Sequence, residues 1–168
     1  MTSRRFDGAE GLVAPLYFVA LLLVATPSLD FITSVLPLRP GNIEWRFATV
    51  GLLSGFVLTP LLGIILAILT AAWAEHMKFQ RIVAIVNAAL TVVFAVVIVL
   101  FLLDIVQLRG VVQAEAKPAF EGAAFKAVLK HVSFVIATGW LALRGFQASR
   151  WSVQESRRAG AGAVVIGS

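Results

Sequence analysis

Residues 82–103 read IVAIVNAALTVVFAVVIVLFLL, an apolar run without a single charged side chain. As an α-helix with a rise of 1.5 Å per residue, this run is about 33 Å long, and the hydrocarbon core of a bilayer is ~30 Å thick. The run is therefore long enough and apolar enough to cross a membrane. It predicts a transmembrane helix.

Three further apolar segments flank this run, at residues 12–26, 47–74 and 125–146. The second is about 42 Å long as a helix, so we expect it to tilt or to extend beyond the hydrocarbon core. Together the four segments predict an all-α polytopic membrane protein with four transmembrane helices in a small bundle. Residues 1–152 would form this single domain. A basic and then Gly/Ala-rich tail, residues 153–168, would follow it.

The composition excludes several other classes of protein. Apolar residues make up 60% of the chain and charged residues only 14%, and cysteine is absent. A soluble domain carries roughly 25% charged residues, so a soluble enzyme and a disordered chain are both excluded. Without cysteine there is no disulfide framework and no thiolate metal site. The net charge of +5 is explained by membrane orientation, and we expect no nucleic-acid binding.

The sequence after the first segment allows two structures. Proline is tolerated in membrane helices, so one kinked helix could continue through Pro27 as far as Leu36. Alternatively, Ser28 caps a short amphipathic helix that lies flat at the interface until Pro37 ends it. We favour the interfacial helix. In both structures Asp30 lies near the membrane surface.

The basic residues predict the orientation of the chain. Cytoplasmic loops of membrane proteins are enriched in lysine and arginine. The short connection 75–81 contains Lys78 and Arg81, and the C-terminal tail is basic. We therefore expect an inner membrane of the cytoplasmic type, with both termini in the cytoplasm and the first helix retained.

Small residues recur at every fourth position of the second segment. This spacing places small side chains along one helix face and allows two helix backbones to approach closely. The face packs either inside the bundle or against another protein, a pigment or a lipid tail, and Pro60 beside it predicts a kink near position 56. The predicted interface residues are Gly51, Gly55, Thr59, Gly63, Ala67 and Ala71.

Several costly polar residues are predicted to lie near one membrane surface. A lysine at membrane depth costs up to about 3 kcal/mol, so Lys130 should have a carboxylate partner, either Asp30 or Asp104. Within the third segment, Asn87 should form a hydrogen bond across helices. The predicted interfacial cluster comprises Asp30, Arg46, Asp104, Lys130 and His131.

His131 is also the residue through which a cofactor could be bound. A histidine with a small residue, Ala127, four positions earlier could ligate haem or a pigment. Alanine is frequent in this chain, however, and an interfacial histidine explains the pattern equally simply. We expect no cofactor and no metal.

The sequence contains no metalloprotease, serine-hydrolase, phosphate-loop or dinucleotide motif. Few residues lie outside the predicted spans. We therefore expect a non-catalytic protein that is embedded in the lipid bilayer and acts through helix–helix contacts. It would be an accessory or structural subunit of a larger membrane complex, for which a bioenergetic complex is one host. The alternative is a small homo-oligomeric transporter or channel.

Overall fold

The computed structural model describes the backbone of residues 7–164 and the side chains of residues 11–147. The described chain forms five α-helices and one 3-10 turn. These are α1 (Asp7–Ser34), α2 (Ile43–Phe56), α3 (Leu58–Trp73), α4 (Met77–Arg109), the turn η2 (Ala114–Ala116) and α5 (Lys117–Val164). Three helices are long and apolar enough to cross a membrane, and the bent pair α2 and α3 makes a fourth span if it is counted as one. The protein is thus an all-α polytopic membrane protein.

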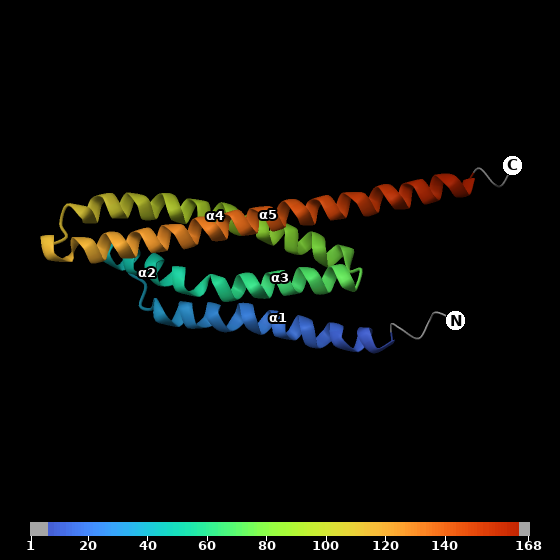
Figure 1. Ribbon diagram of the computed structural model, residues 1–168, viewed down its shortest axis with the longest axis horizontal. Coiled ribbons are helices and arrows are strands. Elements are labelled where there is room, and N and C mark those ends of the chain that lie inside the picture. Colours follow the sequence, from blue (N-terminus) through green and yellow to red (C-terminus); the bar gives the residue numbers. More distant parts are fainter. Residues whose placement is uncertain (1–6, 165–168) are drawn as a thin grey trace.

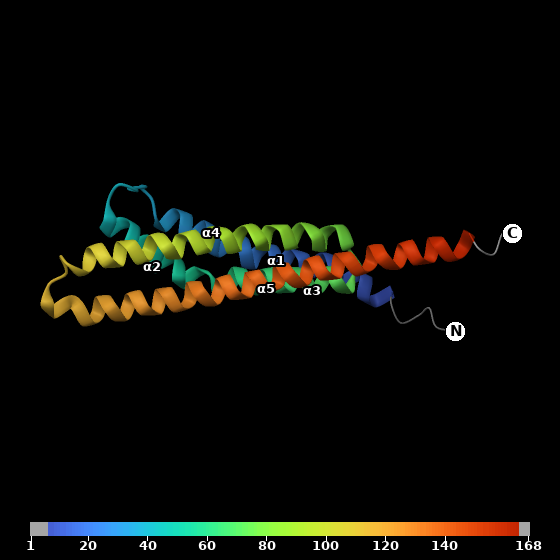
Figure 2. The same cartoon turned by 90° about the horizontal axis from the view of Figure 1, so that it is seen from above.

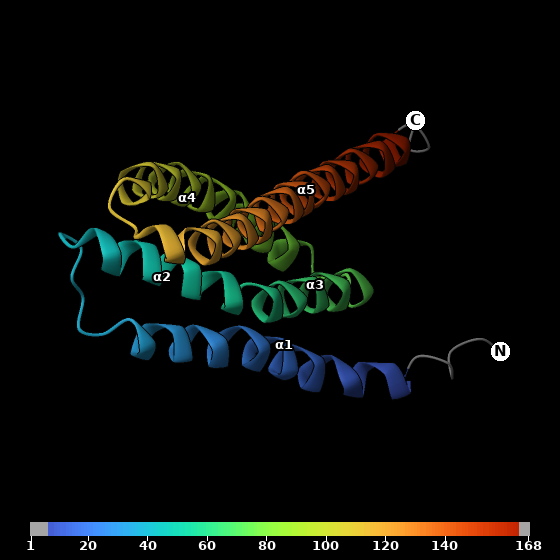
Figure 3. The same cartoon turned by 60° about the vertical axis from the view of Figure 1, so that its left-hand side comes forward.

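The helices run up and down along one axis. α1 begins and α5 ends at the same end of the molecule, and α5 extends well beyond the other helices there (Figure 1). The order of the helices across the molecule places α2 and α3 between α1 on one side and α4 with α5 on the other (Figure 3). α1 packs on α3, α4 packs on α5, and α2 contacts both α4 and α5.

α1 is one helix through both of its prolines, Pro15 and Pro27. The interfacial helix that we favoured after residue 26 is therefore wrong, and the first helix continues to Ser34. The Ser28 hydroxyl does not cap a new helix. It donates a hydrogen bond of 2.6 Å to the carbonyl of Val24, one turn earlier in the same helix. The helix ends before the proline-containing segment that begins at Pro37.

The second predicted span, 47–74, is divided. α2 and α3 meet at Val57 with a bend of 43°. Pro60 causes this break because it has no N–H to donate to the carbonyl four residues earlier, and its ring crowds that carbonyl. The predicted kink near position 56 is confirmed. At its other end α2 is capped by Asn42, whose side chain accepts a hydrogen bond of 2.8 Å from the backbone N–H of Trp45.

α4 and α5 contain the other two predicted spans, 82–103 and 125–146, and both helices are longer than predicted. α5 has 48 residues, about 72 Å of helix, and includes residues 153–164 of the predicted tail. The two helices lie side by side in the view from above (Figure 2).

The buried residues of α4 and α5 follow the three- and four-residue spacing of a left-handed helix pair. A Cβ built on Gly145 of α5 would lie only 2.7 Å from the Cβ of Ala84 on α4, so glycine is required for this approach. On α4 the buried residues are Gln80, Ala84, Asn87, Phe94, Phe101, Asp104 and Leu108. On α5 they are Ala124, Ala127, His131, Phe134, Thr138 and Ala142.

Candidate functional site: polar groups of the bundle interior

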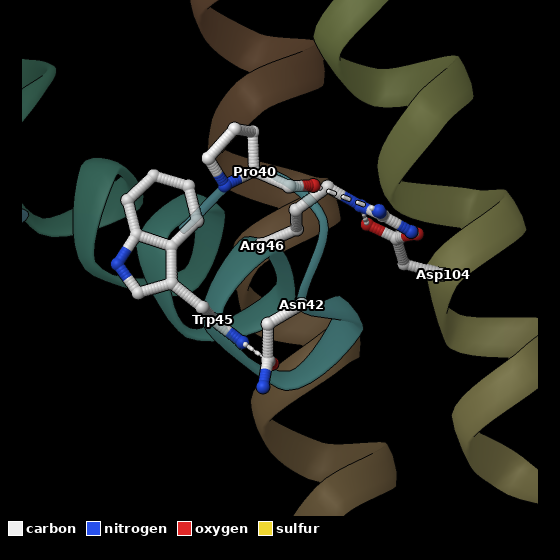
Figure 4. Close-up of polar contacts among 5 residues, drawn as sticks. All are labelled: Pro40, Asn42, Trp45, Arg46 and Asp104. Carbon is white, nitrogen blue, oxygen red and sulfur yellow. Dashed lines mark hydrogen bonds and ion pairs between the residues drawn. The ribbon is translucent and has the colours of Figure 1, made fainter. Parts of the chain in front are cut away.

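An ion pair joins α2 to α4 (Figure 4). The guanidinium Nη2 of Arg46 lies 2.7 Å from Oδ1 of Asp104, and its Nε donates to Oδ1 and Oδ2 of that carboxylate at 3.3 and 3.1 Å. Nη1 of Arg46 donates to the carbonyl of Pro40 at 3.0 Å. The Asp104 side chain is only 6% exposed. The pair is charge-assisted and bidentate, and it also holds the α1–α2 loop.

The start of α2 explains how Arg46 reaches this position. The Asn42 side chain accepts from the Trp45 N–H, and the Asn42 carbonyl accepts from the Arg46 N–H at 3.0 Å. One side-chain and one backbone hydrogen bond therefore fix the first turn of α2. The side chain of Arg46 projects from the first turn of α2. Figure 4 shows it extending toward Asp104 and away from Trp45. Sequence reasoning placed both charged residues in one cluster but did not pair them.

The predicted partner of Lys130 is wrong. Asp104 is taken by Arg46, and Lys130 is exposed and forms no ion pair within the described side chains. Ala127, His131 and Phe134 occupy the buried face of α5, which turns Lys130 outward. The long apolar stem of a lysine in this position can carry its ammonium toward the interface, so a buried partner is unnecessary.

The predicted five-residue cluster is therefore only partly assembled. Arg46 and Asp104 meet, whereas Asp30 is exposed near the end of α1, with its backbone carbonyl accepting from Thr33 and Ser34. His131 is not interfacial in the sense we predicted, because it is buried between α4 and α5.

His131 is 1% exposed, and its ring lies against two phenylalanines of α4. The ring centroids of Phe94 and Phe101 are 5.7 and 6.5 Å from that of the imidazole. Nδ1 of His131 lies 2.7 Å from the carbonyl oxygen of Ala127, and Nε2 has no hydrogen-bond partner. Because a carbonyl only accepts, Nδ1 carries the proton, and in the neutral ring Nε2 is a free acceptor.

A second group of polar residues lies further along the same interface. Oγ1 of Thr91 and Oγ1 of Thr138 are 2.9 Å apart and form a hydrogen bond between α4 and α5. Asn87 does not bond across helices as we predicted. Its amide donates to the carbonyl of Val83 in its own helix, and its Oδ1 has no partner.

The stripe of small residues does not form one continuous face, because the bend at Val57 interrupts it. In α3, a Cβ built on Gly63 would lie 2.8 Å from the carbonyl oxygen of Ala20, so this part of the stripe packs against α1. Ala71 of the same stretch is fully buried. In α2, a Cβ on Gly51 or Gly55 would have no atom within 4 Å. Also in α3, Ala67 is half-buried and Thr59, beside the bend, is exposed. The stripe is thus internal at Gly63 and Ala71 and open at Thr59 and in α2.

An apolar cavity of about 260 Å³ lies beside the break, between α1, the α2–α3 bend and facing side chains of α4 and α5. Its only hydroxyl is that of Ser28, which is already bonded to Val24. Sequence reasoning missed this cavity, because nothing in the sequence shows that Pro27 of α1 and Pro60 of α3 line the same space. The residues lining it include Pro27, Phe31, Phe56, Pro60, Phe94 and Phe134.

The described residues contain no group of three or more His, Asp or Glu side chains that could hold a metal ion. Nε2 of His131 is a ligating atom without a partner, but it is enclosed by protein. No protein-family model, curated protein or solved structure matches this chain.

Proposed function

We propose that this protein is a non-catalytic subunit that binds other membrane proteins through the open face of α2. The observation that supports the proposal is the pair Gly51 and Gly55. They stand one turn apart with no atom within 4 Å of their Cβ positions, whereas Gly63 of α3 and Gly145 of α5 are covered by neighbouring helices.

The physical basis is the nature of helix association in a bilayer. Lipid tails are as apolar as leucine, so hydrophobicity does not drive two membrane helices together. Close van der Waals contact does, and two glycines spaced by four residues form the groove that permits it. Glycine in a helix interior costs about 1 kcal/mol relative to alanine. The two open glycines therefore destabilise α2, and contact with a partner helix would offset that loss of stability.

The remaining parts of the proposal concern the setting. Lys78 and Arg81 in the α3–α4 connection support an orientation with both termini in the cytoplasm of a cell with an inner membrane. The partner would be a membrane subunit of a larger assembly, and a bioenergetic complex is one such host. No cofactor is part of the proposed role.

The test is the mass of the complex extracted in mild detergent, with a matched pair of variants. Gly55→Leu should reduce co-purifying membrane subunits at least tenfold while leaving the thermal unfolding of the protein unchanged. Gly122 of α5 is also open, with no atom within 4 Å of its Cβ position, so Gly122→Leu is the control and should retain them. Equal loss in both variants, or none in either, would contradict the proposal.

A homo-oligomeric transporter or channel is the second candidate, and the buried polar groups of the α4–α5 interface favour it. Asn87, Thr91, Thr138, His131 and Asp104 follow one another along the length of that interface. A native mass that is an integral multiple of 18.0 kDa, with no foreign subunit, would favour this candidate over the first.

A further inference from the structure

The apolar cavity beside the α2–α3 bend is a feature that the proposed helix contact does not use. Its floor is the buried core cluster of Val57, Phe94 and Phe134. Its rim consists of exposed and half-buried side chains, among them Ile32 of α1, which is 52% exposed, and Ile64 of α3. A cavity with a buried floor and an exposed rim, in a bundle of membrane-spanning helices, opens to the surrounding lipid.

The lining offers apolar contacts and no free side-chain hydrogen-bond donor. The rings of Phe31 and Phe56 lie 6.1 Å apart where α1 meets α2, and those of Phe94 and Phe134 lie 4.4 Å apart on the floor. The Ser28 hydroxyl is already bonded to a backbone carbonyl of its own helix at 2.6 Å. A water molecule needs two to four polar partners, so the lining favours an apolar occupant.

The same lining disfavours a ligand with a polar ring, such as the head of an isoprenoid quinone. The carbonyl oxygens of such a ring accept hydrogen bonds, and a buried acceptor without a partner costs about 1–3 kcal/mol. Ser28 supplies the hydroxyl of the cavity, and its hydrogen is donated within α1. A plain hydrocarbon chain needs no hydrogen-bond partner.

The depth of the cavity matches the depth of the acyl chains of one leaflet. Along α2, the lining residue Leu53 lies seven residues after Arg46, which is about 10 Å of helix. Along α1, the lining residue Pro27 lies seven residues before the last helical residue, Ser34. One leaflet contributes about 15 Å of hydrocarbon. The cavity is therefore below the headgroups on the Arg46 side, among the chains of that leaflet.

We propose that the cavity binds one acyl chain of a membrane phospholipid, which enters between α1 and the α2–α3 pair with its headgroup at the surface near the start of α2. An apolar cavity of about 150 Å³ binds benzene. On that scale a cavity of about 260 Å³ holds about ten carbon atoms, the deeper part of one chain. The bound chain gains dispersion contacts with the four phenylalanine rings of the lining.

The experiment is photolabelling of the protein in phosphatidylcholine vesicles that contain a small fraction of phosphatidylcholine with a diazirine in its acyl chain. The labelled residues are mapped by mass spectrometry. Residues 24–32 and 53–64 should be labelled about fivefold more than residues 92–96 of α4, because the contacts of the cavity retain the chain. The comparison is matched in depth, since the exposed Val92, Val93 and Val96 lie about 12–18 Å along α4 from Asp104.

Two outcomes of this mapping would overturn the proposal. Equal labelling of the two regions would mean that the cavity contacts lipid no more closely than any exposed helix face does. Weaker labelling at the cavity than at residues 92–96 would mean that another protein chain covers it. Loss of the label when ubiquinone is added at the same mole fraction as the labelled lipid would assign the site to an isoprenoid instead.

Variants separate binding in the cavity from general contact with lipid. Leu53→Phe adds a ring beside the cavity and should reduce the labelling of α1 and the bend about fivefold. Ile64→Phe fills the cavity from α3 and covers the case in which Leu53→Phe does not fold. Val93→Phe, on the exposed face of α4, is the matched control and should leave the labelling unchanged. Full labelling in a folded cavity variant would contradict the proposal. Neither Gly51 nor Gly55 lines the cavity, so this result is independent of the proposed function.

Discussion

The two halves of the bundle differ in how their helices meet. α4 and α5 form a long interface with an unbroken spacing of buried residues, a cross-helix hydrogen bond between Thr91 and Thr138, and no proline in either helix except Pro118 in the first turn of α5. α1 and the α2–α3 pair contain three prolines and a bend of 43°, and a cavity of about 260 Å³ lies beside that bend. An uninterrupted helix keeps its contact face in register, whereas each proline moves the face that follows it.

The largest expected effect concerns the ion pair that ties the two halves together. Arg46→Met should lower the free energy of unfolding strongly, because it leaves the Asp104 carboxylate, which is only 6% exposed, without its counter-ion. The measurement is equilibrium unfolding in detergent. Arg109→Met is the control, since the Arg109–Glu121 pair is 69% and 51% exposed and should contribute at most about 1 kcal/mol. Adding Asp104→Asn to Arg46→Met should restore part of the loss.

The close contact between α1 and α3 gives the next largest effect. Gly63→Leu should cost about 2–3 kcal/mol, because its side chain would meet the backbone carbonyl of Ala20, which cannot move without shifting α1. Gly55→Leu, in the open part of the stripe, should leave the monomer as stable as the wild type or slightly more so. Unfolding curves of the two variants test this. Similar losses in both would mean that the stripe acts as one face after all.

Filling the cavity should make the packing of the proline-containing half as close as that of α4 and α5. Leu53→Phe adds a ring beside the cavity that Leu53 lines, and filling it should stabilise the protein by about 1 kcal/mol. Val93→Phe on the exposed face of α4 is the control and should have little effect. A lower unfolding temperature for Leu53→Phe would show that the space is not available to an extra ring.

The smallest effect sharpens the description of the α4–α5 interface. Thr138→Val removes the hydrogen bond to Thr91 while keeping the shape of the side chain, and should cost about 0.6 kcal/mol, the typical value for such bonds between membrane helices. Ser133→Ala, whose hydroxyl bonds within its own exposed turn, is the control. A loss above about 2 kcal/mol for Thr138→Val would indicate that the hydroxyl has a further role in the interface.

The sequence by itself determined the all-α class, the positions of the apolar helices and the kink at Pro60. These follow from local properties: an apolar run of sufficient length must hydrogen-bond its own backbone in lipid, and a proline removes one of those bonds. The boundaries were less accurate, because a hydroxyl such as that of Ser28 can cap a new helix or bond back within an old one. Only its neighbours decide between the two.

The tertiary structure alone decided which polar groups meet. The sequence places four polar residues near one end of the bundle: Arg46, Asp104, Lys130 and His131. Successive residues of a helix point about 100° apart, and on α5 this difference leaves Lys130 exposed and His131 enclosed. The tertiary structure also decided what the small-residue stripe contacts. Its spacing is uniform, but Gly63 faces α1 while Gly51 and Gly55 face open space. Spacing along a helix defines a face, and the packing of the other helices defines what that face contacts.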